Sequence, residues 1–415
     1  MKTLLFLVDK RINSKINFLK HLKNHNMKKI LIIEEGYEEV GGVPEGFFDE
    51  MYTVADIANY KQIEPIVSTL IKVHDISAII ATTENIIAVA GQLRSRFGIK
   101  GMQRNQAEAV RNKWIMKEMA RQHGIQSPVT KIASSVREFE ECIHEIGFPL
   151  IIKPIAGWAT IKTYKISDMN QFNEFVKDWT SNPQSMLVEE FISGREFHVD
   201  SIVSKSNVEF TSVSEYLFNC LDVIENNKPL GSIAYSNHNQ QEIVEKLEAF
   251  NQSIIQALGI TNAVCHAEMF VMDNGEIYFG EIAARIGGIA VIPPIVLNTH
   301  GVDLFKAAID VELGTYQDDN SAATDKYTGM ISLPSAVGKV KEISIAEDFS
   351  QIEGIVSINI PVKKGQVLNG GKDTMSRSGF IIVEGYSFEE VKSRLLSVFE
   401  TFTIEVELNP QEVIG

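Results

Sequence analysis

The sequence predicts a mixed fold, α/β with α+β parts, built from several domains. The chain has 415 residues, and at roughly 100–200 residues per domain this length suggests two to four domains, each with its own core. Short apolar runs alternate with helical patterns over the first hundred residues, which predicts a mostly parallel sheet covered on both faces. After about residue 104 the connections become hairpin-like, which predicts antiparallel or mixed sheets. A hydrophobic content of 44% and a charged content of 22% argue against a disordered or fibrous chain.

The N-terminal part shows the strand–helix alternation. Strands are expected at Thr3–Val8, Lys28–Ile33 and Ser77–Thr82, and helices around Ile12–His25, Tyr60–His74 and Asn85–Phe97. No glycine-rich fingerprint follows Val8, so a dinucleotide site is not supported. Two glycines in the segment 98–101 break the pattern, which predicts a domain boundary near residue 100.

The remaining elements follow in order. One helix containing Trp114 is expected from about Arg104 to Gly124, because glycine is typical of a helix C-terminus. Further elements are expected at Pro149–Lys153, Lys162–Ile166, Met186–Phe191, Glu196–Val203, Val208–Tyr216, Gln240–Leu258 (helix), Thr328–Leu333, Val356–Val362, Phe380–Gly385, Phe388–Phe399 (helix) and Thr403–Leu408. Strands Cys265–Met272 and Glu276–Ile282 are joined by Asp273-Asn274-Gly275, and the Asn-Gly pair predicts a hairpin turn with positive φ.

Charge and cysteine content exclude several classes of protein. The formal net charge is −15, which argues against a general binder of nucleic acid or of anionic membranes, because those partners are themselves anionic. The three cysteines, Cys142, Cys220 and Cys265, lie far apart, so a disulfide framework or a zinc cluster is not expected. The apolar run Thr3–Val8 is too short for a signal peptide or a membrane span. We therefore expect a cytoplasmic protein.

The hairpin after Cys265 carries two acids, Glu268 and Glu281, on otherwise apolar strands. Two inward carboxylates on neighbouring strands would repel each other unless a cation lay between them. Oxygen ligands together with phosphate suit Mg²⁺ or Mn²⁺. The alternative is that both acids are exposed strand residues.

Two lysines and an acidic hairpin complete the set of candidates. Lys153 ends an apolar strand, which is an unfavourable place for a charge unless it has a partner such as a nucleotide phosphate. Lys113 lies on the preceding helix and by itself is more typical of a solvated surface residue. The hairpin 187–197 could present backbone groups to adenine and Glu196 to ribose hydroxyls, or it could be an ordinary acidic hairpin.

The order of these pieces is more specific than any one of them. A helix lysine, a Lys-Pro pair closing a strand, Val188-Glu189-Glu190, Gly194 with Glu196, and Glu268 ahead of Glu-Ile-Ala-Ala-Arg-Ile-Gly-Gly follow one another along the chain. The sequence thereby resembles the ATP-grasp superfamily of carboxylate–amine ligases over essentially its whole length. The resemblance implies an ATP-grasp fold with a substrate-side α/β domain (1–103), a small lid domain (104–183) and a C-terminal mixed-sheet domain (184–415) with a terminal lobe from about 328.

The resemblance also implies residue roles. Lys113 and Lys153 would contact the ATP phosphates, Glu189 and the backbone of Glu190 and Phe191 would bind adenine, Glu196 would bind ribose, and Glu268 and Glu281 would hold Mg²⁺. Arg285 would neutralise the transferring phosphoryl group or a substrate carboxylate, and the amides of Gly287 and Gly288 would serve an oxyanion. This division fits the chemistry, because phosphoryl transfer depends mostly on positioning and charge neutralisation.

Two positions depart from the pattern of the superfamily. The lid loop 156–160 has one glycine, Gly157, where many members have several, which leaves its phosphate cradle in doubt. Ala283 stands where many relatives carry a metal-binding asparagine, which leaves the ligands of a second metal ion in doubt.

The run from Glu281 to Gly288 and the C-terminal lobe look most like the L-amino-acid ligases, which join two amino acids into a dipeptide. In these enzymes an arginine at position 285 holds the carboxylate of the incoming amino acid, and a glycine at position 288 stabilises the oxyanion. His238 lies where they often place a histidine near the substrates, although a lone histidine after a strand is more often structural. Tyr235 and Glu84 are weaker candidates, and Trp158 is a lid or core residue. Asp222 or Glu225 could pair with a cationic substrate side chain or simply be solvated.

The resemblance implies ATP-dependent dipeptide synthesis from small-molecule amino acids through an acylphosphate, in an enzyme of a superfamily where homodimers are common. Two alternatives stay open at this point. One is an ATP-grasp ligase or carboxylase that acts on a non-amino-acid carboxylate or on bicarbonate. The other is a non-catalytic ATP-binding sensor, against which the retention of Arg285 argues.

Overall fold

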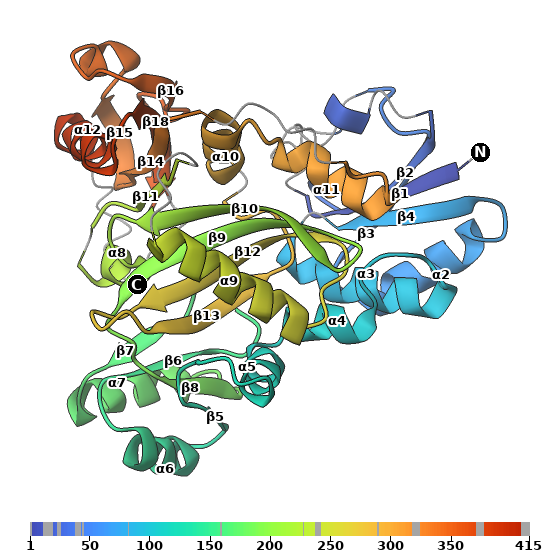
Figure 1. The fold of residues 1–415 in the computed structure, drawn as a ribbon, viewed down its shortest axis with the longest axis horizontal. Coiled ribbons are helices and arrows are strands. Elements are labelled where there is room, and N and C mark those ends of the chain that lie inside the picture. The colour runs from blue at the N-terminus through green and yellow to red at the C-terminus, as the bar shows by residue number, and fades with distance from the viewer. Residues whose placement is uncertain are drawn as a thin grey trace.

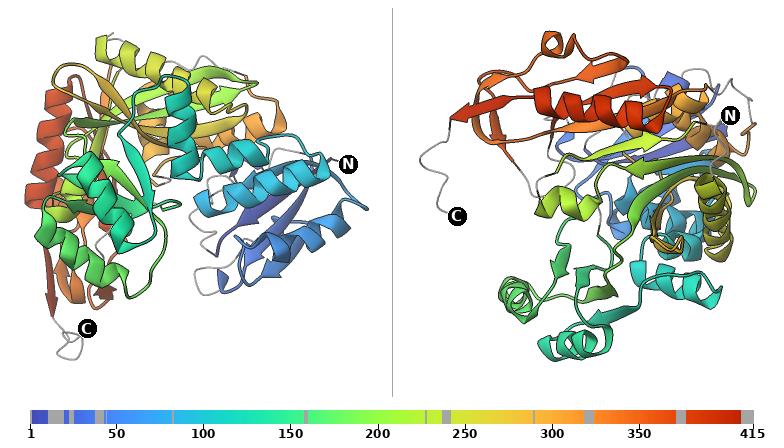
Figure 2. Two further views of the ribbon diagram at one scale, coloured as in Figure 1. Left: turned by 90° about the horizontal axis from the view of Figure 1, so that it is seen from below. Right: turned by 60° about the vertical axis from the view of Figure 1, so that its left-hand side comes forward.

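The computed structural model describes residues 2–10, 20–22, 26–37, 43, 45–81, 83–157, 160–226, 228–236, 242–288, 290–317, 324–370 and 377–407. The strands of these residues form four sheets, of four, eight, three and four strands. Figures 1 and 2 show the four-stranded sheets at two ends of the molecule, with the eight-stranded sheet between them. The predicted mixed α/β fold is confirmed.

The N-terminal sheet is parallel, as predicted, with the strand order β3-β2-β1-β4. Its elements are β1 (Lys2–Val8), β2 (Lys28–Glu34), β3 (Glu50–Val54), α2 (Tyr60–Leu70), β4 (Asp75–Ala81) and α3 (Glu84–Phe97). Strand β3 was not predicted, because its side chains are mostly half-exposed and it lacks an apolar run. The predicted helix 12–25 falls largely outside the described residues.

The two faces of this sheet have different partners. Leu5 and Leu7 of β1 pack with residues of α2 and α3, whereas Leu4 and Phe6 pack with residues of α10 (Ile292–His300) and α11 (Leu304–Leu313), far along the chain. Side chains alternate between faces along a strand, so one short strand joins two cores. This packing brings the N-terminal domain against the C-terminal part of the chain.

The single helix predicted from 104 to 124 is two helices, α4 (Arg104–Ala109) and α5 (Lys113–Gln122). Asn112 begins α5, because its side chain accepts hydrogen bonds from the backbone N–H groups of Trp114 and Ile115. Gly124 follows the helix with φ of 73°, which confirms its predicted place at the helix end. The break orients Lys113 at the first turn of α5.

The lid sheet is antiparallel, with the order β5-β8-β6-β7. Its elements are β5 (Thr130–Ala133), α6 (Val136–Ile146), β6 (Leu150–Pro154), β7 (Tyr164–Ile166), α7 (Met169–Trp179) and β8 (Met186–Glu190). Leu150, Ile152 and Val188 pack with α6 and α7, so Lys153 and Glu189 lie on the other face of the sheet. Strand β8 belongs to this sheet but lies beyond residue 183, where the predicted lid domain ends. The predicted domain ranges stay predictions.

The body sheet has eight antiparallel strands in the order β13-β12-β9-β10-β11-β14-β18-β16. They are β9 (Arg195–Ser204), β10 (Asn207–Tyr216), β11 (Gly231–Ala234), β12 (Ala263–Val271), β13 (Ile277–Ala283), β14 (Tyr327–Pro334), β16 (Ile355–Asn359) and β18 (Arg377–Gly385). The β12–β13 turn has Gly275 at φ of 84°, which confirms the predicted hairpin. The lid sheet lies below the body sheet in Figure 1.

The remaining elements cover the body sheet or form the terminal lobe. They are α8 (Cys220–Glu225), α9 (Glu242–Ala257), α12 (Phe388–Thr401), the 3₁₀ turn Ala346–Phe349 and the strands β15 (Val337–Ile343), β17 (Val367–Asn369) and β19 (Ile404–Glu407) of a three-stranded sheet. Among the described helices, none combines the length and apolar character that crossing a membrane requires.

Candidate functional site

The two hairpin acids face the same side of the body sheet. Glu268 of β12 and Glu281 of β13 are directly opposite each other in the antiparallel register, and residues opposite each other project from the same face. Their side chains are 25% and 31% exposed. The two acids therefore lie next to each other, and their role as metal ligands stays a prediction.

Lys113 neutralises one of these acids. Its Nζ atom lies 2.8 Å from a carboxylate oxygen of Glu281, and it also donates to the backbone oxygen of Gly157 at 3.1 Å. Burial alone would raise the pKa of Glu281, but the ammonium groups of Lys113 and Lys153 outweigh it and lower this pKa to about 2. The predicted phosphate lysine thus joins the lid loop to the predicted metal ligand.

The lid face contributes a second cluster of charges. Lys153 Nζ lies 2.5 Å from Glu189, Lys117 Nζ lies 3.6 Å from the same carboxylate, and Thr130 Oγ1 donates to it at 3.3 Å. Burial raises the pKa of Glu189, and the two lysines outweigh this effect and lower it. Lys153 is 15% exposed and does not point into bulk solvent.

Lys117 was not among the predicted site residues, although it follows Lys113 by four positions and so shares its face of α5. It donates to the backbone oxygen of Phe279 at 2.7 Å, and burial lowers its pKa to about 8 despite the neighbouring carboxylate of Glu189. It therefore links the lid face to β13.

The hinge after β8 carries the residues predicted to bind adenine. The backbone N–H groups of Glu190 and Phe191 donate to the oxygens of Val129 and Pro149, at 2.9 and 3.3 Å. The carboxylate of Glu189 is taken up by lysines. Because these N–H groups and this carboxylate already have partners, adenine would contact hinge carbonyl groups or require the hinge to rearrange. The predicted adenine contacts stay predictions.

Glu196 is buried and lies near the partly exposed Glu268. A carboxylate oxygen of Glu196 accepts from the backbone N–H of Cys220 at 2.7 Å. Burial, together with the charge of Glu268, raises its pKa to about 8, and burial raises the pKa of the Cys220 thiol far above its ordinary value. Glu196, Cys220 and Glu268 bring their ligand atoms within 4.8 Å of one another. The ribose role of Glu196 stays a prediction.

Arg285 meets Glu84 across the domain boundary. Its Nη2 and Nε atoms donate to one carboxylate oxygen of Glu84 at 2.7 and 3.2 Å, and Arg111 lies 3.3 Å from the other oxygen. Arg111 also donates to the lid-loop oxygens of Ala156 and Gly157, at 2.7 and 3.3 Å. Arg111 was missed by the sequence analysis; its position two residues before Lys113 is the signal that could have identified it.

Gly287 and Gly288 follow Arg285 in a tight loop before α10. A methyl group on Gly287 would lie 2.3 Å from Nδ1 of His266, and one on Gly288, whose φ is 33°, would contact Ile292 at 2.9 Å. Glycine is required at 287 by this close approach and at 288 by both contact and backbone. The predicted oxyanion role of the loop stays a prediction.

The other candidates separate clearly. Tyr235 donates to Glu215 at 2.7 Å and stacks with Phe197 and Phe388, so it is a core residue. His238 and Trp158 lie outside the described residues. Asp222 and Glu225 lie on the short helix α8, and burial raises the pKa of Glu225. Neither acid has a contact that favours a substrate role.

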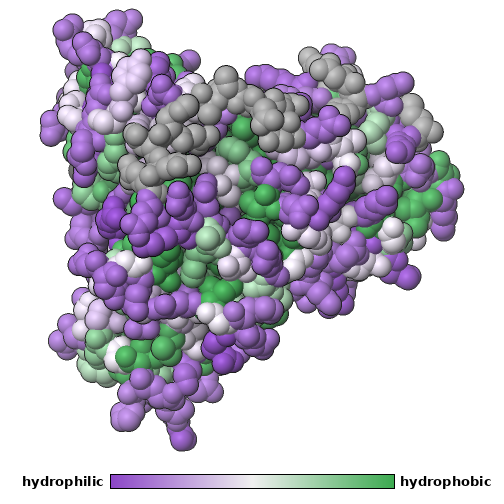
Figure 3. All heavy atoms as spheres, in the orientation of Figure 1, coloured by the Kyte–Doolittle hydropathy of each residue, from purple (hydrophilic) through white to green (hydrophobic). Residues whose placement is uncertain are grey.

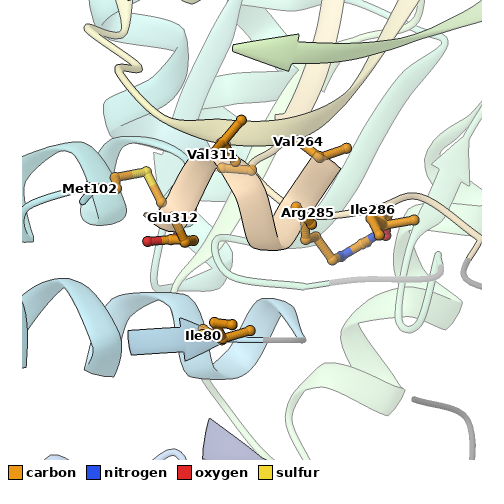
Figure 4. A pocket seen from close by; sticks show the side chains of 11 residues that line it. Ile80, Met102, Val264, Arg285, Ile286, Val311 and Glu312 are labelled. Carbon is orange, nitrogen blue, oxygen red and sulfur yellow. The ribbon is translucent and has the colours of Figure 1, made fainter. Parts of the chain in front are cut away.

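A small cavity lies beside Arg285 between the N-terminal sheet and α11. Its volume is about 40 Å³, and Figure 4 shows Ile80, Val264, Arg285 and Glu312 among its lining residues. Such a volume holds about one water molecule, whereas small-molecule sites measure roughly 300–1,000 Å³. In its present shape the cavity is therefore too small for an amino acid. Figure 3 shows hydrophilic residues over much of one outer face of the molecule.

The donor set of Glu268 and Glu281 fits a divalent ion. Both ligands are carboxylates with partial exposure, and the cation now beside Glu281 is the ammonium group of Lys113. Mg²⁺ is commonly bound through one or two carboxylates, with phosphates and water completing its shell. The residues present can therefore hold Mg²⁺ together with a nucleotide.

Comparison with protein families agrees with this geometry. Residues 146–292 match the model of an ATP-grasp domain, and residues 330–407 match the L-amino acid ligase C-terminal domain 2. The first match contains Lys153, Glu268, Glu281 and Arg285.

Relatives and solved structures extend the likeness to the whole chain. The chain is 27% identical over 370 residues to the L-arginine-specific L-amino acid ligase of Bacillus subtilis, covering 86% of this chain and 87% of that protein. It is 27% identical over 337 residues to dapdiamide A synthase of Enterobacter agglomerans, covering 77% of each. The crystal structure of an L-amino acid ligase from Bacillus licheniformis shares the fold, with a TM-score of 0.79 and 17% identity over 98% of both chains.

The two matched domains contain most of the residues that the structure brings together. The matched ATP-grasp domain brings with it the use of ATP and a divalent metal ion. The chain contains an ATP-grasp domain followed by the C-terminal domain of the L-amino acid ligases, and it is an ATP-dependent carboxylate–amine ligase.

Proposed function

We propose that this enzyme joins two unprotected L-amino acids into a dipeptide, with release of ADP and phosphate. The observation that carries the proposal is the pair Glu268 and Glu281, opposite each other in register and adjacent to Lys113, with Arg285 four residues further along the same segment. The L-amino acid ligase C-terminal domain supports the same class of substrate.

The proposed reaction has two steps. A carboxylate oxygen of the first amino acid attacks the γ-phosphorus of ATP, the bond to the β,γ-bridging oxygen breaks, and an acylphosphate and ADP result. The amine of the second amino acid then attacks the acyl carbon, phosphate leaves with the C–O bond electrons, and the amine loses a proton. ATP is needed because direct condensation of a carboxylate with an ammonium ion in water is unfavourable.

The side chains have distinct parts in this reaction. Lys113 and Lys153 would bind phosphate oxygens, which requires each to exchange its present carboxylate partner for the nucleotide. Mg²⁺, held by Glu268 and Glu281, would neutralise charge on the triphosphate. Mn²⁺ offers the same octahedral oxygen coordination and would serve in its place. Phosphoryl transfer needs this positioning and neutralisation more than covalent help from the protein.

Arg285 and Glu84 supply charges complementary to an amino acid. A free amino acid carries an ammonium group and a carboxylate, and the pair offers one carboxylate and one guanidinium in contact at 2.7 Å. A bound amino acid would replace the Arg285–Glu84 pair with two new pairs, its carboxylate with Arg285 and its ammonium group with Glu84. Glu84, which the sequence analysis ranked low, therefore gains support as a substrate residue alongside Arg285, while the expected homodimer stays a prediction.

The test is a matrix of amino-acid pairs with ATP and Mg²⁺, in which phosphate release is measured and products are identified by mass. We expect phosphate release matched by a dipeptide for at least one pair. Phosphate release without a condensed product across all twenty amino acids would contradict the proposal, and release that requires bicarbonate would identify a carboxylase.

Two variants make this test specific to the site. Glu281→Gln should abolish matched release, because it removes one of the two predicted metal ligands. Glu276→Gln, at the exposed turn of the same hairpin, should leave it unchanged. Unaltered ATP affinity and turnover in Glu281→Gln would show that the metal assignment is wrong.

A further inference from the structure

A buried aspartate lies at the centre of the body sheet, behind the predicted metal ligands. Asp200 of β9 is fully buried, and the register places it opposite His266 of β12, while its neighbour His198 lies opposite Glu268. Since Glu268 also lies opposite Glu281, polar side chains form adjacent rows on one face of three strands. The catalytic roles proposed above use Glu268 and Glu281 but neither Asp200 nor His266.

Asp200 fixes the orientation of two imidazole rings. His198 Nδ1 lies 2.8 Å from one of its carboxylate oxygens, and His266 Nδ1 lies 2.9 Å from the other. An ionised carboxylate only accepts hydrogen bonds, so both histidines donate their Nδ1–H group to it. Because both Nδ1 atoms are occupied in this way, the three residues form an internal hydrogen-bond cluster rather than a metal site.

The other edge of the His266 ring faces the predicted machinery. Its Nε2 atom lies 3.7 Å from a carboxylate oxygen of Glu268. Its ring also lies directly against the backbone of Gly287, where a Cβ atom would be 2.3 Å from Nδ1 and 2.6 Å from Cγ. One side chain therefore touches both a predicted metal ligand and the glycine loop that follows Arg285.

We propose that His266, oriented by Asp200, is a positioning residue that sets the place of the Glu268 carboxylate and of the Gly287 loop relative to each other. The inference rests on the proposed function, in which Glu268 holds Mg²⁺. Groups that orient a metal-binding side chain contribute about 10–100-fold to metal affinity or activity. The pair Asp200–His266 supplies such a group from the interior of the sheet.

The principal test measures how nucleotide binding depends on Mg²⁺. ADP binding to the full chain is titrated calorimetrically over a series of Mg²⁺ concentrations and in the absence of divalent ions. In His266→Asn we expect the half-saturating Mg²⁺ concentration to rise about tenfold or more, with metal-free ADP affinity within about twofold of wild type. An unchanged Mg²⁺ requirement in this variant overturns the proposal.

A double-mutant cycle separates positioning from general damage. If His266 acts through Glu268, His266→Asn should add less than about twofold when Glu268→Gln is already present. Effects that multiply overturn the proposal. His300→Asn is the matched control, because His300 is also a buried imidazole that contacts this sheet, through Ser212 of β10; its Mg²⁺ requirement should equal that of wild type.

The cycle also distinguishes this inference from the proposed function. A higher Mg²⁺ requirement in Glu268→Gln but not in His266→Asn leaves the metal site intact and overturns only the role of His266. An unchanged requirement in Glu268→Gln overturns the metal site itself, and the role of His266 with it.

A second variant covers the case in which His266→Asn does not fold. The φ angle of Gly287 lies outside the left-handed region that disfavours alanine, and the three atoms nearest to a Cβ at this position all belong to the His266 ring. The close approach that favours glycine at 287 is therefore an approach to this ring, and alanine would displace it. Gly287→Ala should therefore raise the Mg²⁺ requirement about tenfold as well, although residue 287 itself contacts no carboxylate in the proposal. A folded Gly287→Ala protein with the wild-type Mg²⁺ requirement overturns the proposal.

Discussion

The lid sheet and the body sheet both carry acids at the site, but these acids differ in their exposure and in their contacts. Glu189 of the lid sheet is 3% exposed, and both of its oxygens have partners, in Lys153, Lys117 and Thr130. Glu268 of the body sheet is 25% exposed, and its contacts with Tyr216 and His266 are long, at 3.5 and 3.7 Å. The charge of Glu189 is compensated at short distances, whereas the contacts of Glu268 are long; its neighbour Glu281 is paired with Lys113.

The difference indicates which acids stabilise the fold and which are candidates for binding a ligand. A fully buried carboxylate must be paired, because the desolvation of an isolated charge is very unfavourable. A partly exposed carboxylate beside a second one is repelled less when a cation lies near the pair. Lys113 supplies such a cation beside Glu281, and a divalent ion would supply another beside Glu268. We therefore expect substitutions on the lid face to act first on stability, and those on the body face to act first on turnover.

The largest effect should come from the lid pair. Lys153→Met removes the 2.5 Å ion pair of the buried Glu189 and leaves it Lys117 at 3.6 Å and the hydroxyl group of Thr130. It should lower the free energy of unfolding by about 3–5 kcal/mol, measured by denaturant titration. Adding Glu189→Gln should restore part of the loss. Lys131→Met, which breaks an exposed pair with Glu145, should cost less than about 1 kcal/mol. A loss that small in Lys153→Met would remove the contrast between the sheets.

The body acid should behave in the opposite way. Glu268→Gln removes a negative charge that faces Glu281, so the free energy of unfolding should change by less than about 1 kcal/mol. Turnover should fall about 10²–10³-fold, the range for removing one stabilising group of a transition state, measured as ATP-dependent phosphate release. Strong destabilisation with wild-type turnover would reverse our view of this sheet.

A buried histidine on the body side should be visible in the pH dependence of stability. Burial lowers the pKa of His300 to about 4, against a small opposing effect of Asp200. The unfolded chain, with a pKa near 6.5, binds the proton first, so stability contributed by neutral His300 is present above about pH 6.5 and is lost as pH falls towards 4.

This loss should reach at most about 3 kcal/mol, since one pKa unit corresponds to about 1.4 kcal/mol. Thermal unfolding of wild type and of His300→Gln between pH 4 and 7 measures it, and the variant should lose less stability on acidification. Parallel curves for the two proteins would show that His300 does not carry the effect.

The smallest effect should come from the domain boundary. Arg285→Lys keeps the charge but replaces two N–H donors to Glu84 with one ammonium group. The KM for the amino acid should rise about tenfold, or 1.4 kcal/mol, while the KM for ATP stays within about twofold. Arg96→Lys, at an exposed position of α3, is the control. An effect confined to ATP would place Arg285 at the phosphates instead.

Much of the lid and body sheets could be predicted because their signals are local. Side chains alternate between faces along β6, so Lys153 and the apolar Ile152 lie on opposite faces of the lid sheet. The turn at Gly275 fixes which residues of β12 and β13 face each other. Strand β3 and helix α10 are two of the several elements that the sequence analysis missed, and the reasons are equally local. The first lacks an apolar run, and the second begins with two prolines, Pro293 and Pro294, which suit a first helical turn but suggest a break.

The sequence by itself determined the nature of the site: the acids of one hairpin, the lysines before them, and the arginine and glycines after them, in an order typical of one superfamily. Only the tertiary structure decided their partners. Glu84 and Arg285 are 201 residues apart, Lys117 and Phe279 are 162 apart, and Asp200 and His266 are 66 apart. Such pairs form because sheets dock and strands align in register, and neither event leaves a periodic signal in the local sequence.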